Sequence, residues 1–200
     1  GAGPRAIGVG YHEGVNIAFD ANNMRLAMIW HGEFIDGARH WIGRGQGFQP
    51  PAGNDVIRLP EGLAIAELKT KDSTWPEFEY RTKELEFDGY VLDKFQRPTF
   101  KYSRDEISIS DKPVPVSSSF DEKPGVIHRK LKFVDKGNSQ NLYFRLARGN
   151  FEKDKDTFSN SELVISVEGG KVFAEKGELR VPIQFNGGKS ELKITYSWAE

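Results

Sequence analysis

The stretch NIAFDANNMRLAMIWHGEFID, residues 16–36, decides the fold class. Two runs of apolar and β-branched residues, 15–19 and 25–30, flank the turn-forming Ala21-Asn22-Asn23. This pattern predicts two extended strands joined by a turn that uses positive-φ residues. The second strand leads directly into aromatic and ionisable side chains, so we expect the end of this hairpin to carry functional residues.

The next stretch, GARHWIGRGQGFQPP at residues 37–51, has too much Gly and Pro for a regular element. It also carries Arg, His and Trp within a few residues, which favours an irregular loop that serves as a working surface. We therefore predict a ligand-binding surface between Trp30 and Phe48. Its candidate residues are His31, Glu33, Asp36, Arg39, His40, Trp41, Arg44 and Phe48.

Short alternating runs recur along the rest of the chain, and most are too short for helices. Leu179, Val181, Ile183 and Phe185 fall on one face of such a run, which is typical of antiparallel sheet with one dry face. We expect an all-β fold with little helix, arranged as an antiparallel β-sandwich. A large mutarotase-like sandwich is one version of this fold. We expect residues 1–200 to form a single domain, excised from a larger protein. The predicted strands are 6–9, 15–19, 25–30, 56–59, 63–68, 80–87, 90–92, 99–102, 106–110, 126–134, 141–147, 162–167, 171–174, 178–185 and 190–198.

Local signals also predict the connections. Asp88-Gly89 and Asn186-Gly187-Gly188 are expected to form tight turns, the second within a closing meander. Residues 112–119 contain two prolines and three serines, so we expect a loop there. Residues 76–85 are the one helix candidate.

Composition excludes several classes of function. The formal net charge is −1, from 28 basic and 29 acidic residues, which argues against a nucleic-acid partner. Cysteine is absent, so disulfides, thiolate zinc sites, iron–sulfur clusters and covalently attached haem are excluded from this chain. There is no run of about eighteen apolar residues, so we expect no membrane insertion.

No complete catalytic or metal-binding motif is present in the sequence. His31 and His40 are nine residues apart, which is not a zinc-ligand spacing, so we predict no metal site. Calcium at the turn near Asp20 and Asn22 stays open. For sugar binding, Trp30, Trp41, Trp75 and Phe48 are candidates, because an aromatic ring packs on the apolar face of a pyranose. Alternation with Leu26 and Met28 favours a core position for Trp30, whereas Trp41 could be buried or exposed.

Several segments resemble a β-rich domain, without assigned function, of large secreted proteins from Planctomycetes and related bacteria. The resemblance covers nearly the whole chain. It rests on residues 4–10, 19–30, 34–36, 41–45, 87–93, 98–102, 142–147 and 194–198. In those proteins the domain accompanies a c-type cytochrome or a dehydrogenase-like module. The resemblance implies a periplasmic or extracellular location and such a module as a neighbour, with any covalent haem on that neighbour; it supplies no catalytic residues.

Three functions are compatible with these observations. We expect a non-catalytic accessory domain that binds a ligand, with carbohydrate as the leading candidate, or contacts a neighbouring module. The first alternative is a sugar-acting enzyme of mutarotase-like type, with His31 or His40 as acid and Glu33 or Asp36 as base. The second is a structural spacer.

Overall fold

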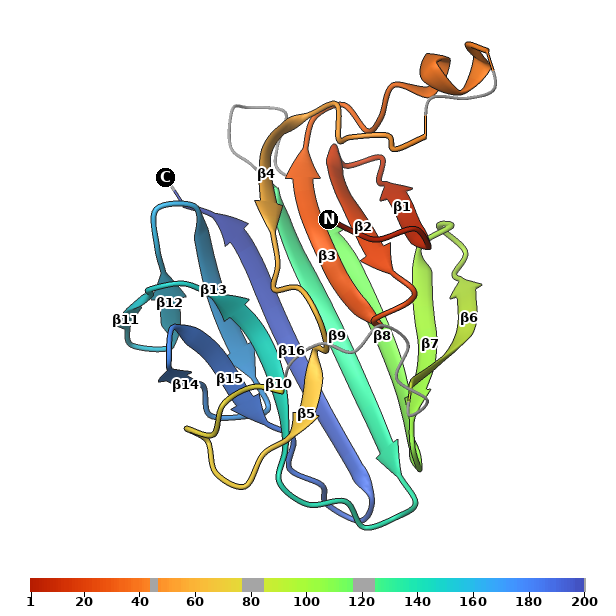
Figure 1. Cartoon of the computed structure of the whole chain (residues 1–200). Helices are drawn as coiled ribbons and strands as arrows, with labels where there is room; N and C mark the ends of the chain where they lie inside the picture. Colours follow the sequence, from red (N-terminus) through yellow and green to blue (C-terminus); the bar gives the residue numbers. More distant parts are fainter. Residues whose placement is uncertain (44–46, 77–84, 117–124, 200) are drawn as a thin grey trace.

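The computed structural model describes residues 1–43, 47–76, 85–116 and 125–199. Within these ranges the chain is almost entirely β-strand, with one short 3₁₀ helix, η1 (Gly37–Trp41). The strands form three antiparallel sheets, which confirms the predicted all-β sandwich (Figure 1). No helix in the described part of the chain is long and apolar enough to span a membrane.

Two small sheets and one long sheet make up the fold. The first small sheet has the order β1 (Ala6–Gly10), β2 (Val15–Asp20), β3 (Arg25–His31), β4 (Asn54–Arg58). The second small sheet has the order β14 (Phe173–Glu175), β15 (Glu178–Pro182), β10 (Leu142–Arg148), β5 (Ile65–Glu67). The long sheet has the order β11 (Glu152–Asp154), β12 (Thr157–Ser159), β13 (Leu163–Glu168), β16 (Lys189–Trp198), β9 (Val126–Asp135), β8 (Ile107–Val116), β7 (Pro98–Arg104), β6 (Leu85–Leu92).

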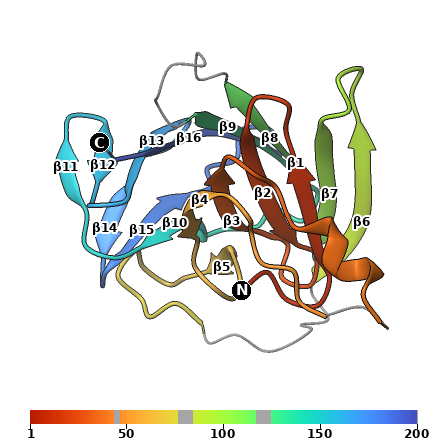
Figure 2. The same ribbon diagram turned by 90° about the horizontal axis from the view of Figure 1, so that it is seen from above.

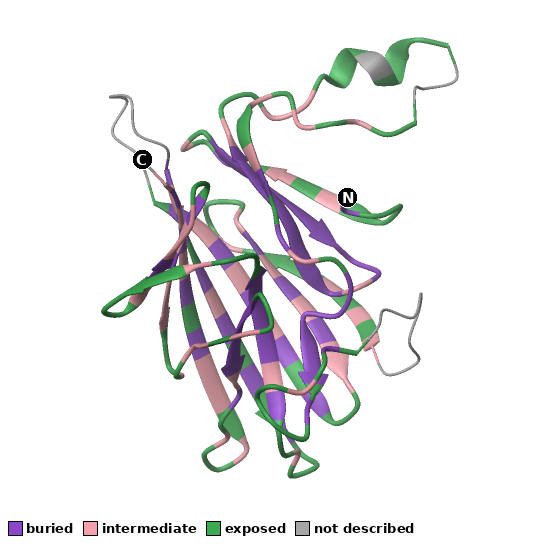
Figure 3. Ribbon diagram, turned by 60° about the vertical axis from the view of Figure 1, so that its left-hand side comes forward, coloured by how far each residue is buried: buried purple, intermediate pink, exposed green. Residues whose placement is uncertain are grey.

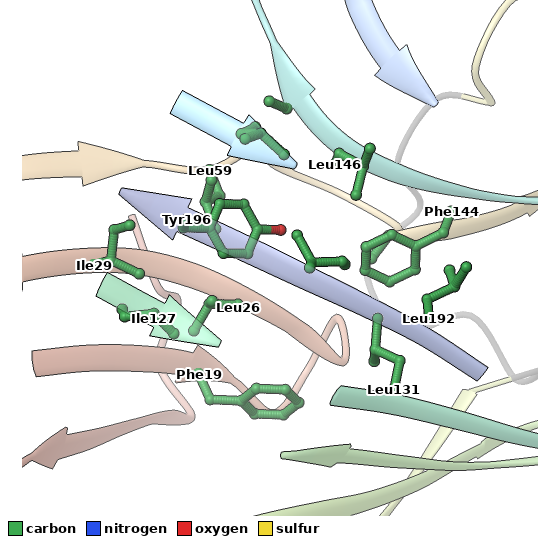
Figure 4. Close-up of a cluster of buried hydrophobic side chains, with 14 of the residues drawn as sticks. Phe19, Leu26, Ile29, Leu59, Ile127, Leu131, Phe144, Leu146, Leu192 and Tyr196 are labelled. Atoms are coloured by element: carbon green, nitrogen blue, oxygen red, sulfur yellow. The ribbon is translucent and has the colours of Figure 1, made fainter. Parts of the chain in front are cut away.

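The two small sheets lie side by side on one face of the long sheet, as the views in Figures 1 and 2 show. The main core fills the space between these layers, and its side chains come from all three sheets (Figure 4). Phe19 of β2 stacks on Phe100 of β7 with ring centroids 4.0 Å apart. The outer face of the first small sheet is therefore left free of the long sheet.

Strand β8 continues through residues that the sequence assigns to a loop. Pro113 and Pro115 lie inside it, and it pairs with β9 as far as Val116. Strand β7 pairs with β8 only up to Asp111, so both prolines lie beyond that ladder. The loop prediction is thus wrong for 112–116, because an N–H missing at an uncovered stretch of strand costs no ladder hydrogen bond.

One predicted turn is a bulge, and another forms but joins strands of different sheets. Asp88-Gly89 is a β-bulge within the continuous strand β6, with Gly89 at φ 106°. Asn186-Gly187-Gly188 does form a turn, yet β15 and β16 belong to different sheets, so the predicted closing meander is wrong. At the β2–β3 turn the positive φ falls on Met24 instead of the asparagines. The helix candidate at 76–85 lies mostly outside the described residues, and Leu85 begins β6.

Two buried arginines hold the connection between the small sheets. Arg25 of β3 donates to the carbonyls of Leu59 and Pro60, while Arg145 of β10 donates to the carbonyls of Glu61 and Leu63. Burial lowers the pKa of both guanidinium groups, against the opposing effect of Asp20 on Arg25 and of Glu178 on Arg145. The clamp fixes residues 59–63 at the end of the outer face on which the candidate site lies.

Candidate functional site

A groove of about 980 Å³ lies over the outer face of the first small sheet. The N-terminal residues, β1–β3 and the segment from Phe34 to Pro51 supply most of its walls. Figure 3 shows η1 and the described residues next to it standing clear of the sheets and largely exposed. The described residues that line the groove are Gly1, Ala2, Gly3, Pro4, Ala6, Gly8, Ala18, Asp20, Asn22, Asn23, Arg25, Met28, Trp30, Phe34, Ile35, His40, Gly47, Phe48, Gln49, Pro51, Glu61 and Gly62.

Trp30 lies in the floor of the groove instead of the main core. A β-bulge between β2 and β3 places Ala18 opposite Met28 but Phe19 opposite Leu26, so Ala27 is an extra residue in β3. Leu26 faces the main core, whereas Met28 and Trp30 join a separate buried cluster on the opposite face. The prediction that Trp30 is a buried core residue is confirmed, because it is 2% exposed, but the bulge places it in this second cluster and not in the main core with Leu26.

Phe34 lies next to Trp30, and both residues line the groove. The two rings stack with centroids 5.8 Å apart and planes 4° apart. The Trp30 indole N–H donates to the backbone carbonyls of Glu33 (3.0 Å) and Phe34 (3.2 Å), which fixes the chain where it leaves β3. A Cβ on Gly8 or Gly10 would lie 2.9 Å or 3.1 Å from the Phe34 ring, so β1 can accept this ring only on bare backbone.

Asp20 organises the polar end of the groove, at the β2–β3 turn. Its buried carboxylate accepts hydrogen bonds from the backbone N–H groups of Asn22 (2.9 Å) and Asn23 (3.3 Å) and from Asn23 Nδ2 (2.6 Å). It also forms an ion pair with Arg25, with Nε and Oδ2 3.4 Å apart. Arg44 of the predicted ligand-binding set lies outside the described residues.

Two amide atoms at this end have no hydrogen-bond partner among the described residues. They are Asn22 Nδ2 and Asn23 Oδ1, and both are buried. A buried polar atom without a partner costs free energy, and such atoms are uncommon in folded proteins. Both residues line the groove, but these two atoms are themselves covered by protein.

The arm, defined here as residues 34–51, carries large exposed apolar side chains. Asp36 caps η1 by accepting from the Ala38 N–H (3.0 Å). This short helix contradicts the prediction of a wholly irregular loop. Trp41 is 90% exposed, Ile42 59% and Phe48 67%. The question of whether Trp41 is buried or exposed is therefore settled in favour of exposure.

The structure brings only part of the predicted ligand-binding set to the groove. His40 and Phe48 line it. His31 lies at the end of β3, where its Nε2 is 2.6 Å from Asp55 Oδ2 and its ring meets Trp198 edge-on. Glu33 and Asp36 are exposed and are absent from the described lining, as is Trp41. Arg39 lies within η1.

Other candidates from the sequence have structural partners. Trp75 is buried, with the guanidinium groups of Arg145 and Arg180 4.9 Å and 5.4 Å from its ring, so it offers no face to a sugar. Within the described part of the chain, no group of three or more His, Asp or Glu side chains is arranged to hold a metal ion.

The imidazoles and carboxylates proposed for the enzyme are not arranged as acid–base pairs among the described residues. The contact of His31 is with Asp55, which the sequence interpretation did not name. Of the carboxylates in the described lining, Asp20 is paired with Arg25 and Glu61 with the amino group of Gly1. His40 therefore has no free carboxylate beside it among the described lining residues.

Most of the groove could not be foreseen from the sequence. Gly3, Pro4 and Glu61 come from distant parts of the chain, and no local pattern brings them together. The sequence predicts Asn22 and Asn23 as turn formers and leaves calcium open at this turn, whereas in the structure both residues line the groove. Phe34 could have been found from two glycines alternating in β1, because such bare strands often accept a ring from a neighbouring segment.

A scan against protein-family models finds no match to this chain, and searches of the curated proteins and of the solved structures find none either. The resemblance to the planctomycete domain accordingly stays a prediction. The function is therefore inferred from the groove itself.

Proposed function

We propose that this chain is a non-catalytic binding module that holds a stretch of carbohydrate in the groove over the first small sheet. The observation that carries the proposal is the make-up of the groove walls. The aromatic rings of Phe34 and Phe48 share one groove with the amide side chains of Asn22 and Asn23. Aromatic faces pack on the apolar faces of pyranose rings, and amides exchange hydrogen bonds with sugar hydroxyls.

The size of the groove favours an oligosaccharide over a single sugar. Its volume of about 980 Å³ is at the upper end of the range for small-molecule sites, roughly 300–1,000 Å³. The groove extends from the Asp20 turn to the arm, so a chain of linked rings could contact both the polar end and Phe48.

The charges around the groove favour an uncharged ligand. The Asp20 carboxylate and the Arg25 guanidinium neutralise each other, and Arg25 also donates to three backbone carbonyls. Glu61 is likewise ion-paired, with the amino group of Gly1 at 2.7 Å. Both carboxylates of the described lining are thus paired, which suits an uncharged glycan.

The arrangement of acids and bases supports binding without turnover. General acid–base catalysis needs an imidazole or carboxyl group within reach of the reacting atoms and a partner of complementary protonation. His40 lines the groove on the arm, and the carboxylates of the described lining, Asp20 and Glu61, are already ion-paired with other groups.

We propose further that the module lies outside the cytoplasm. The exposed Trp41 and Ile42 of the arm then contact a neighbouring cytochrome or dehydrogenase-like module.

Phe48→Ala tests the proposed function. We expect cello- or chito-oligosaccharides to raise the melting temperature of the domain, because a ligand that binds only the folded state stabilises it. The variant should bind the same sugar about tenfold more weakly, through loss of the ring contact. Isothermal titration calorimetry measures both affinities.

Phe95→Ala is the matched control, because Phe95 is 64% exposed in the β6–β7 turn and is absent from the described lining of the groove. It should bind like the wild type. Equal losses in both variants, or equal affinity of Phe48→Ala and the wild type, would contradict the proposal.

A further inference from the structure

One edge of the first small sheet is open. Strand β1 pairs with β2 on one side, and with no strand on the other side in the described part of the chain. We propose that this edge binds an extended peptide segment of a partner protein, which adds a further strand to the sheet. The inference goes beyond the proposed function, because the sugar groove overlies the face of β1, whereas the peptide bonds its edge.

Hydrogen bonds at the two ends of β1 show which backbone groups face outward. The Tyr11 N–H donates to the Val15 carbonyl (3.1 Å), and the Ala21 N–H donates to the Arg5 carbonyl (3.2 Å). Hydrogen-bonded pairs alternate along antiparallel strands, and the β1–β2 register is continuous, so the odd-numbered residues of β1 bond to β2. The residues whose N–H and C=O groups face away from β2 are Ala6, Gly8 and Gly10.

These outward-facing groups are accessible to a partner. All three residues are exposed, whereas Ile7 and Val9 between them are half-buried against the main core. Gly8 and Gly10 have no side chain, so their exposure is that of the backbone itself. Within the described chain, no backbone hydrogen bond outside the β1–β2 ladder involves any of the three.

β1 lacks the features by which proteins protect sheet edges. These features include charged side chains, prolines, bulges and very short strands. The edge strands β4 and β11 carry charged side chains, β6 has a bulge at Asp88, and β5 and β14 are three residues long. β1 has the sequence Ala-Ile-Gly-Val-Gly and an unbroken ladder, so its edge is ready to pair with another strand.

Uncovered apolar side chains near this edge suit an added strand. Tyr90 and Leu92 of β6 lie opposite Phe100 and Pro98 of β7, which are buried. Opposite residues share a face of the sheet, so Tyr90 and Leu92 also face the core side, yet they are 53% and 47% exposed. β6 lies beyond the β1 end of the first small sheet (Figure 2). A strand next to β1 extends that sheet toward both side chains.

The occupant that fits this edge best is an acidic peptide. Arg5 precedes β1, and the Glu13–Arg97 ion pair holds the β6–β7 turn, which contains Lys94, next to the β1–β2 turn. Arg5 and Lys94 are exposed, and neither forms an ion pair with a described residue. A segment in which carboxylates flank alternating apolar residues complements both. A second copy fits less well, because two five-residue strands, each about 17 Å long, bury much less than the roughly 1,200 Å² of a stable interface.

Amide hydrogen exchange tests the proposal, with the peptide acetyl-Glu-Thr-Val-Thr-Val-Thr-Glu-amide as the probe. Without peptide, the amides of Ala6, Gly8 and Gly10 should exchange freely, while β2 protects those of Ile7 and Val9. Peptide at about ten times its dissociation constant should slow the outward amides about tenfold, because their exchange then requires dissociation. NMR with water saturation transfer measures these amides one by one.

Ala6→Pro blocks the added strand. It removes an N–H that β2 does not use, so the melting temperature should stay close to that of the wild type, while the peptide affinity falls at least about tenfold. Lys153→Pro is the matched control, because it introduces proline into β11, the exposed edge strand at the far end of the long sheet. It should leave the peptide affinity unchanged.

Unchanged exchange of the three outward amides at peptide concentrations up to about 1 mM would overturn the proposal, and so would equal peptide affinity of Ala6→Pro and the wild type. Slow exchange of these amides without peptide, together with a dimer in sedimentation, would assign the edge to a second copy and also overturn it. If Ala6→Pro does not fold, exchange in the wild type decides alone. None of these results bears on Phe48-dependent sugar binding, which rests on the groove.

Discussion

Asp111 and Arg129 show how strongly single residues are constrained inside this fold. Both side chains are buried, and Arg129 donates two hydrogen bonds to Asp111, of 2.8 Å and 2.5 Å. The Tyr102 hydroxyl donates to the same carboxylate, and the guanidinium lies 5.2 Å from the Phe144 ring centre. Burial alone would lower the pKa of Arg129, but the charge and hydrogen bonds of Asp111 raise it above the usual value.

Removal of one partner from this pair should be far more harmful than replacement of both. Asp111→Ala leaves a buried, uncompensated guanidinium, so we expect the free energy of unfolding to fall by about 3–5 kcal/mol. The double variant Asp111→Leu/Arg129→Met should recover most of that loss, because it leaves no charge behind. Urea unfolding of the three proteins measures both effects; a cost below about 1 kcal/mol for Asp111→Ala would show that the pair is not desolvated as described.

At the level of elements, β6 shows that an Asp-Gly pair does not by itself predict a turn. Gly89 supplies a positive φ, as the sequence predicts, but in a bulge where the strand continues. Both halves of β6 pair with β7, so no hairpin forms at Asp88. The same dipeptide serves a turn or a bulge, and only the identity of the pairing partner decides between them.

Asp93 in the β6–β7 turn should make this element sensitive to acid. Its carboxylate accepts from Lys112 Nζ (2.9 Å) and from the backbone N–H groups of Phe95 and Arg97. The hydrogen bond from Lys112 first, and these backbone bonds with it, lower the pKa of Asp93 from 3.8 to about 2. The carboxylate therefore stabilises the folded state above pH 3.8, and this contribution is lost as the pH falls through about 2.

Asp93→Asn should accordingly be less stable than the wild type at pH 7. The difference in stability should shrink as the pH falls from 3.8, the ordinary pKa of an aspartate, toward about 2, the pKa of Asp93 in the folded protein. Thermal unfolding of both proteins across this range measures the difference. A gap that stays constant with pH, or that widens in acid, would show that the carboxylate is not held in its charged form.

For the molecule as a whole, local pattern predicts which residues form strands but not which sheet they join. The alternation of Leu192, Ile194, Tyr196 and Trp198 correctly predicts their burial. It contains no information that β16 lies between β13 and β9 while β15 joins β10.

The candidate site divides in the same way. The sequence locates the exposed arm with His40 and Phe48. The opposite wall of the groove, which includes Gly3 and Glu61, depends on contacts between residues far apart in the sequence.

Ligand binding over the outer face of the first small sheet can be followed directly through the four tryptophans. Trp30 lies beneath Phe34 in the groove, whereas the indoles of Trp75 and Trp198 donate to the carbonyls of Leu63 and Asp55, and neither residue belongs to the described groove lining. In a titration with chitotetraose followed by the indole N–H signals in ¹H–¹⁵N NMR spectra, we predict that the Trp30 signal shifts while those of Trp75 and Trp198 stay in place. A shift of Trp75 or Trp198 with an unchanged Trp30 signal would place the ligand away from the groove and contradict the proposed function.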